Sequence, residues 1–124
     1  MMGRVTYEQM AAFWPTAATA YAASMNELPK VVFSSILRHA SWAPTRIARG
    51  PLDEEIAELK QEPGGEIVAH GGGAFVQALS VRGLIDIYRL IIHPVALGTG
   101  LPLFKKPAEA AALDAHRGTE LRDR

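Results

Sequence analysis

The sequence contains no cysteine, no excess charge of either sign and no long hydrophobic run. Without cysteine there is no disulfide scaffold and no thiolate zinc site, and the chain is compatible with a reducing cytoplasm, where we expect it to act. The 13 basic residues balance the 13 acidic ones, so we expect neither nucleic acid nor a membrane surface as a partner. No apolar stretch approaches the roughly 18 residues that span a bilayer. The 4 histidines have no ligand spacing, so no metal is expected.

The chain does have enough apolar residues for one small core. Its 124 residues are 48% hydrophobic, which suits one domain rather than two. Beyond Phe104 the pattern changes. Residues 107–115 are alanine-rich and predict a helix, whereas residues 116–124 are charged and predict a surface tail.

Strand-like and helix-like segments alternate along the chain. Apolar spacing and capping signals predict helices, with Thr6 as an N-cap, Pro51 at a first helical position and Gly83 closing the last helix. The alternation implies a layered α/β fold whose sheet is largely parallel. The predicted strands are residues 30–34, 46–48, 66–69 and 85–93, and the predicted helices are residues 6–13, 19–27, 51–62 and 74–82.

Three successive glycines, Gly71, Gly72 and Gly73, follow one predicted strand and precede one predicted helix. Glycine lets the backbone turn sharply without Cβ clashes. A helix that begins near Ala74 directs unpaired N–H groups and the positive end of its dipole toward an anion. Taken alone, the motif fits a phosphate-binding turn and an ordinary strand-to-helix turn equally well.

Several motifs occur in a fixed order over residues 3–104. In this order they resemble the dihydrofolate reductase superfamily, and within it the bacterial branch similar to the reductase domain of riboflavin biosynthesis. The resemblance implies a dihydrofolate-reductase-like three-layer fold with a mostly parallel central sheet over residues 1–106, followed by a helix or tail over residues 107–124. The motifs are Gly3-Arg4-Val5-Thr6-Tyr7-Glu8, Phe13-Trp14-Pro15, Lys30-Val31-Val32-Phe33-Ser34, His70-Gly71-Gly72-Gly73, Asp86-Ile87-Tyr88-Arg89-Leu90 and His93-Pro94-Val95-Ala96-Leu97-Gly98-Thr99-Gly100.

The resemblance places cofactor contacts in the first and third motifs. It implies that Gly3, Arg4 and Thr6 meet the NADPH pyrophosphate at a helix start, where the alternative is an ordinary capped helix with a surface arginine. It also implies that Ser34 and Ser35 hold the adenosine end of the cofactor, where the alternative is a polar strand end. Because Ser35 replaces a basic residue often found in the family, NADH stays open beside NADPH.

The resemblance gives the glycine motif a stronger meaning than its sequence alone. It implies that Gly71, Gly72 and Gly73 bind the cofactor diphosphate, together with Ala74 and Phe75 at the start of the following helix. It further implies a cis peptide bond between Gly71 and Gly72. Such a bond costs about 3–4 kcal/mol and persists only where its surroundings hold it.

The activity implied by the resemblance is hydride transfer from NADPH to a pyrimidine- or pteridine-type heterocycle. Trp14 and Thr99 are the candidate substrate contacts, with a core aromatic and a glycine-held loop as the respective alternatives. No catalytic residue is assigned, because hydride transfer needs geometry more than a protein base. A second class stays open, namely a truncated and non-catalytic relative that retains only the fold or a nucleotide-binding surface.

The chain departs from the family pattern before Gly3 and after Phe104. Relatives carry a first strand and first helix before the first motif, and a terminal hairpin after the last. The resemblance places that first strand between residues 66–69 and 85–93, so two strand edges lose their partner, which costs free energy. We therefore expect a homo-oligomer, most simply a two-fold dimer formed through sheet edges or residues 85–93.

Overall fold

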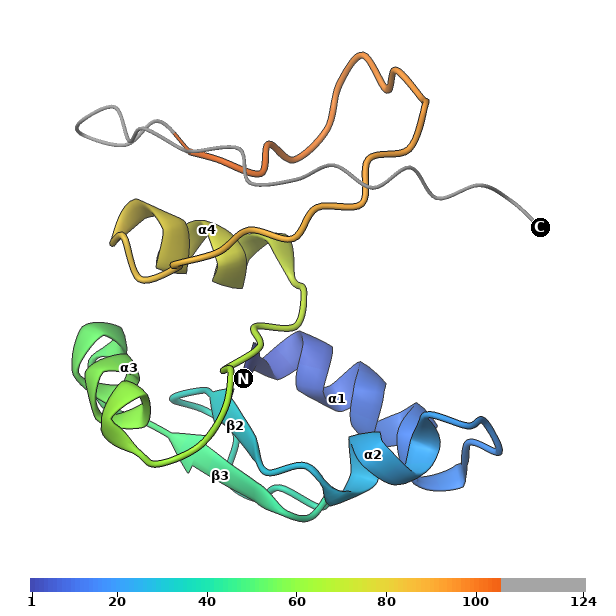
Figure 1. The fold of residues 1–124 in the computed structure, drawn as a ribbon, viewed down its shortest axis with the longest axis vertical. Coiled ribbons are helices and arrows are strands. Elements are labelled where there is room, and N and C mark those ends of the chain that lie inside the picture. Colours follow the sequence, from blue (N-terminus) through green and yellow to red (C-terminus); the bar gives the residue numbers. More distant parts are fainter. Residues whose placement is uncertain (106–124) are drawn as a thin grey trace.

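A three-stranded parallel sheet lies in the lower part of the computed structural model shown in Figure 1, which describes residues 1–105. Its strands are β1 (Met2–Gly3), β2 (Lys30–Phe33) and β3 (Thr45–Ala48), in the order β1-β2-β3. Val32 is the register partner of both Met2 and Ile47. The α/β class and the parallel sheet are confirmed.

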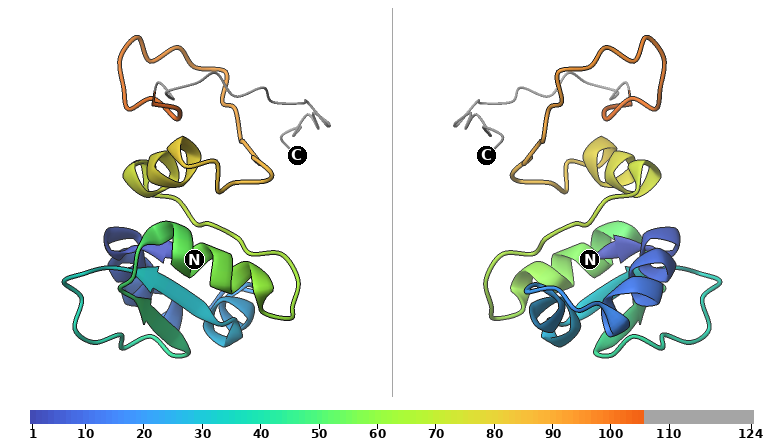
Figure 2. Two further views of the ribbon diagram at one scale, coloured as in Figure 1. Left: turned by 90° about the vertical axis from the view of Figure 1, so that its left-hand side faces the viewer. Right: turned by 90° about the vertical axis from the view of Figure 1, so that its right-hand side faces the viewer.

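Helices lie on both faces of this sheet (Figure 1, Figure 2). One face carries α1 (Arg4–Phe13), the 3₁₀ helix η1 (Trp14–Thr16) and α2 (Ala22–Glu27), and the other carries α3 (Leu52–Gln61). The chain then rises to α4 (Gly73–Val81) and continues beyond it without further helix or strand up to residue 105. All helices predicted within the described residues form, with their ends shifted by a few residues, as is usual for fraying termini.

Aromatic residues anchor the core between α1, α2 and the sheet. Tyr7 and Trp42 are both buried, with ring centroids 6.2 Å apart. Their polar groups are satisfied: the Trp42 backbone N–H donates to the Tyr7 hydroxyl at 2.9 Å, and Trp42 Nε1 donates to Asn26 Oδ1 at 2.7 Å. Met2 and Val32 complete this cluster, so β1 and β2 are held by the same packing as α1.

A buried lysine closes the end of α2. Lys30 Nζ donates to the carbonyls of Met25, Asn26 and Leu28 at 3.1, 3.0 and 2.8 Å, and it lies 4.4 Å from the Trp42 ring centroid. These carbonyls are among those that a helix end leaves without partners. Burial lowers the pKa of Lys30, and the three acceptors keep the buried ammonium hydrogen-bonded.

Gly83 ends α4 in the way its sequence position predicted. Its φ of 64° is left-handed, its N–H donates to the Ser80 carbonyl at 3.0 Å, and the N–H of Leu84 donates to the Leu79 carbonyl at 3.0 Å. This pair of bonds forms a Schellman motif, which commonly closes a helix at glycine.

Two predicted strands do not join the sheet, so the predictions for residues 66–69 and 85–93 are wrong. Residues 68–70 nevertheless lie beside β1, because the Met1 amino group donates to the Val68 carbonyl at 2.6 Å and the His70 N–H donates to the Met1 carbonyl at 2.9 Å. Pairing stops after this single step because β1 is two residues long. Within the described part of the chain, residues 85–92 make no backbone–backbone hydrogen bond, since no strand edge lies next to them.

The predictions for the end of the chain lie outside the described residues. They are the helix over residues 107–115, the tail over residues 116–124 and the boundary at residue 106. Between residues 1 and 105, no helix combines the length and the apolar character that crossing a membrane would need.

Candidate functional site

A groove of about 430 Å³ lies where the carboxyl ends of β2 and β3 meet the start of α1 and α4. This edge is where open parallel α/β sheets bind their ligands. The groove brings together four residues predicted to contact a cofactor, Arg4, Ser34, Ser35 and Phe75, from three distant parts of the sequence. We call it the carboxyl-edge groove. Its full lining is Arg4, Phe33, Ser34, Ser35, Ile36, Ala48, Arg49, Gly50, Leu52 and Phe75.

The turn formed by Gly71, Gly72 and Gly73, which we call the glycine turn, packs directly against the first turn of α1. A Cβ placed on Gly72 would lie 2.8 Å from Thr6 Oγ1, and a Cβ on Gly3 would lie 3.4 Å from the Cβ of Phe75. A Cβ on Gly73 would collide with the side chain of Leu101. The first and fourth sequence motifs, which are almost seventy residues apart, therefore form one site in which side chains at Gly72 and Gly73 would have little room.

Thr6 is not the N-cap of α1, so that prediction is wrong. The helix begins at Arg4 and its N-cap is Gly3, because β1 leads straight into the helix. Thr6 instead lies in the first turn, where its hydroxyl faces Gly72. In this position Thr6 still lies between the first motif and the glycine motif, both of which the resemblance assigns to cofactor binding.

The expected cis peptide between Gly71 and Gly72 is absent, and the cis bond in the described residues precedes Pro44. The glycine turn is made by positive backbone angles instead, with φ of 23° at Gly71 and 81° at Gly72. Residues with a Cβ rarely adopt such angles. The turn thus requires glycine at Gly72 for both its conformation and its contact with Thr6.

The helices that start at this edge differ in the charge of their first turns. The N-caps of α1 and α4 are Gly3 and Gly72, neither helix has a side-chain cap, and neither has an acidic residue in its first turn. Their positive ends are therefore available to an anion. The first turn of α3, in contrast, carries its own carboxylates, Asp53, Glu54 and Glu55.

Glu55 accepts hydrogen bonds from the loop that leads into α3 and from β3. Its carboxylate accepts from the Gly50 N–H at 2.9 Å and from Arg46 Nη1 at 3.1 Å. The Gly50 hydrogen bond, and then the Arg46 charge, lower the pKa of Glu55. This helix start is occupied by an internal anion, so α1 and α4 are the helices that fit an external one.

Two arginines supply positive charge to the groove. Arg4 Nη1 lies 2.9 and 2.7 Å from the carboxylate oxygens of Glu8 on the surface of α1. Arg49 donates to the carbonyls of Ser35 and Leu37 at 3.3 and 2.6 Å, which fixes its guanidinium beside the turn after β2. The sequence analysis missed Arg49, although its position directly after a predicted strand was a signal. Arg49, one residue after β3, thus places a cation beside Ser35.

Ser34 and the groove aromatics give this end of the site its shape. Ser34 Oγ accepts from the N–H groups of Ile36 and Leu37 at 3.2 and 2.9 Å, so its hydroxyl hydrogen is left to donate to a ligand. The Phe33 and Phe75 rings pack with their centroids 5.3 Å apart. Together they form an apolar surface beside polar and cationic groups, as small-molecule sites require.

The structure does not bring Trp14 or Thr99 to the carboxyl-edge groove. Trp14 follows α1 at its far end, about 15 Å from the start of a ten-residue helix, and packs half-buried against the core. Thr99 lies in an exposed loop. Their suggested substrate contacts stay predictions.

His70, next to the glycines, has a lowered pKa because of burial and, secondarily, the positive charge of the Met1 amino group. It is therefore neutral at neutral pH. Among residues 1–105, no group of three His, Asp or Glu side chains has the arrangement of a metal site.

Comparison with known proteins assigns the chain to a family. A family model described as "RibD C-terminal domain" matches residues 1–122. The chain belongs to the RibD C-terminal domain family. A protein of Bacillus subtilis (strain 168), "Uncharacterized protein YyaP", is 47% identical over 51 residues, which are 41% of this chain and 27% of that protein. The matched part thus spans about a quarter of that relative's length.

Membership of the RibD C-terminal domain family confirms the resemblance that the motifs suggested. The family consists of reductase-like domains with a dihydrofolate-reductase-like fold, and it is associated with riboflavin biosynthesis. RibD C-terminal reductase domains generally bind NADPH. The carboxyl-edge groove and the glycine turn are the parts of this chain that fit such a ligand.

Proposed function

We propose that this protein is an NADPH-dependent reductase of a pyrimidine- or pteridine-type heterocycle that acts in the cytoplasm. The observation that carries the proposal is the meeting of two uncapped helix N-termini, those of α1 and α4, beside a groove with two arginines and no carboxylate in its lining. This combination suits a phosphorylated ligand that also has an aromatic part.

The residues present fit the diphosphate of such a cofactor. The turn at Gly72 and the start of α1 at Gly3 are close enough that a Cβ on either would touch the facing motif, so the backbone itself forms the surface that meets the ligand. The first N–H groups of α1 and α4 supply donors, and Arg4 supplies charge once it exchanges Glu8 for phosphate.

The far end of the groove fits the adenosine part. Ser34 and Ser35 offer hydroxyl donors, and Arg49 has donors left over after binding two carbonyls. A guanidinium held in place in this way suits a phosphate with several acceptor oxygens. We therefore propose that Arg49 favours NADPH over NADH by pairing with the phosphate that NADH lacks.

The cofactor supplies the hydride, and the chain supplies position. The groove residues orient the cofactor, and Phe33 and Phe75 exclude water from its apolar side. No described residue needs to act as a nucleophile for this chemistry.

Calorimetric titration tests the binding step. The unmodified protein is expected to bind NADPH more tightly than NADH, and Arg49→Gln is expected to weaken NADPH binding by about tenfold to a hundredfold while leaving NADH binding nearly unchanged. Arg38→Gln is the matched control, because Arg38 is an exposed arginine outside the groove lining. No binding of either nucleotide at millimolar concentration would refute the proposal.

Turnover is tested separately by NADPH oxidation with pyrimidine and pteridine acceptors. Oxidation that depends on the acceptor supports the reductase. Tight NADPH binding without oxidation with any of these acceptors supports the other class, a nucleotide-binding relative without catalysis.

A further inference from the structure

A buried amide side chain lies on α4, about one helical turn after the glycine turn. Gln77 is 2% exposed, and Lys30 is the other polar or charged residue that is buried among those the structure describes. Burying an amide costs free energy unless its polar groups are hydrogen-bonded. Gln77 lies outside the lining of the carboxyl-edge groove, so a direct contact with a ligand there does not account for it.

The amide of Gln77 holds a stretch of chain that comes back over α4. Its Nε2 donates to the carbonyl of Pro102, 25 residues later in the chain. The chain around residue 100 lies on the side of α4 that faces away from the sheet (Figure 1, Figure 2). We call residues 101–104 the returning segment.

The first residue of the returning segment packs on the glycine turn. The side chain of Leu101 lies so close to Gly73 that a Cβ on this glycine would collide with it. Gly73 and Gln77 are one turn apart and therefore share a face of α4. Leu101 is 68% exposed, so burial contributes little to keeping it there. The hydrogen bond from Gln77 to the next residue, Pro102, therefore holds Leu101 over Gly73.

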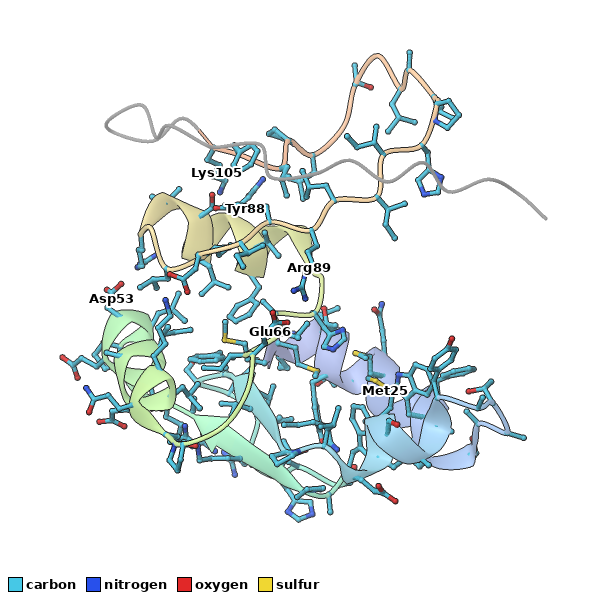
Figure 3. The ribbon with its side chains drawn as sticks, in the orientation of Figure 1. Met25, Asp53, Glu66, Tyr88, Arg89 and Lys105 are labelled. Atoms are coloured by element: carbon cyan, nitrogen blue, oxygen red, sulfur yellow. The ribbon has the colours of Figure 1, made fainter. Side chains whose placement is uncertain are left out.

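A second contact fixes the far end of the returning segment. Ser80 Oγ and the Tyr88 hydroxyl are 2.7 Å apart, and the Tyr88 and Phe104 rings meet edge-on with their centroids 5.2 Å apart. Figure 3 shows Tyr88 beside α4. Ser80 lies about 10 Å along the helix from Gly73. This second contact is therefore remote from the glycine turn.

The glycine turn needs support from outside because its own chain is flexible. Glycine has more conformational freedom to lose than any other residue. A Cβ on Gly71 would meet nothing within 4 Å among the described residues, so packing does not hold the turn at that position. The N–H groups of Phe75 and Val76 donate to the Gly72 carbonyl at 3.0 and 3.1 Å. These two hydrogen bonds of α4 depend on the shape of the turn.

We propose that Gln77 is a positioning residue that acts through Leu101. It holds the returning segment on Gly73 and so keeps the glycine turn in the shape that presents the first N–H groups of α4 to a phosphate. A site that already has its bound shape loses less entropy when the ligand binds. The support of the turn is a property of the chain without ligand, whereas its benefit for binding rests on the proposed function.

Amide hydrogen exchange without nucleotide tests the support of the turn. Gln77→Met keeps a side chain of similar length and removes the donor. It is expected to speed exchange of the Phe75 and Val76 amides about fivefold or more, the factor that one ordinary hydrogen bond supplies. Ser80→Ala is the matched control, since it removes the remote contact of the same helix and is expected to leave both rates within about twofold. Unchanged rates in Gln77→Met, or equal acceleration by Ser80→Ala, would overturn the proposal.

Calorimetric titration with NADPH tests whether Gln77 acts through Leu101. Leu101→Ala trims an exposed side chain, so the fold is expected to survive, and circular dichroism checks that each variant is folded. Each single variant is expected to raise the dissociation constant of NADPH about fivefold, and the double variant is expected to bind no more weakly than the weaker single variant. Effects that multiply would contradict action through Leu101. If the unmodified protein binds no NADPH, the proposed function fails, and the exchange rates decide whether Gln77 supports the turn.

Discussion

Substitution of Gly72 by alanine tests the contact that joins the glycine turn to α1. The substitution forces a residue with a Cβ to a φ of 81°, which costs about 1–2 kcal/mol. It also places the Cβ 2.8 Å from Thr6 Oγ1, an overpacked contact that costs about 1–3 kcal/mol. We therefore expect Gly72→Ala to lower the free energy of unfolding by about 2–5 kcal/mol.

The two contributions separate in a double-mutant cycle. Thr6→Ala removes the hydroxyl that meets the new Cβ, so the double variant retains only the backbone cost and recovers about 1–3 kcal/mol relative to the sum of the single variants. Gly65→Ala is the control, because Gly65 has no positive φ and a Cβ there meets nothing within 4 Å; its effect is expected within about 0.5 kcal/mol.

Equilibrium unfolding in urea, followed by circular dichroism, measures these differences as shifts of the midpoint at a constant slope. A Gly72→Ala protein as stable as the original would refute the strained turn. Strict additivity of the Gly72→Ala and Thr6→Ala effects would refute the contact between the two motifs.

Three further predictions concern the scaffold. Lys30→Met is expected to lower the free energy of unfolding by about 2–3 kcal/mol, because three carbonyls lose a charged donor; urea unfolding measures this, and an unchanged midpoint would contradict the cap. Gly83→Ala is expected to cost about 1–2 kcal/mol because of its left-handed φ of 64°, again measured in urea, and a stabilising effect would contradict the Schellman motif. The folded pKa of His70 is lowered, so the unfolded chain binds the proton first: stability is present above about pH 6.5 and falls as the pH drops through the folded pKa. Thermal unfolding at several pH values should show a smaller loss for His70→Gln, and equal losses would exclude His70 as a cause.

Elements with strong local patterns were predictable from the sequence. The β-branched run around Val32 forms β2, and the weaker candidate around Ile47 forms β3. Gly83 closes α4 because left-handed conformation at a helix end is a local property of glycine. In each case the information lies within a few residues.

Features that depend on distant neighbours were not predictable in the same way. β1 has two residues, too few for any periodicity, and is specified by its packing against β2. Residues 85–93 have the composition of a strand, but a strand also needs an edge to pair with, and none reaches them within the described residues. Composition measures the tendency to pair and not the presence of a partner.

The candidate site likewise contains residues that were predictable from the sequence and one that was not. The resemblance pointed to Gly72 and Ser34, and the structure places these residues by the groove or its adjoining turn. The resemblance did not point to Arg49, whose place in the groove depends on β3 lying next to β2 and on its side chain reaching over the neighbouring turn. Such contacts between strands become visible only once the sheet is assembled.

The pairing of β1 with segments much later in the chain has a consequence for synthesis on the ribosome. Met2 and Gly3 are translated well before their partners Val32 and Phe33, and Met1 well before its hydrogen-bond partners Val68 and His70. The nascent chain therefore cannot complete the hydrogen bonds around β1 until residues 68–70 have been translated. Until then the segment around β1 lacks some of its pairing partners. Slow translation before residue 70 would therefore prolong the exposure of this segment to chaperones and proteases.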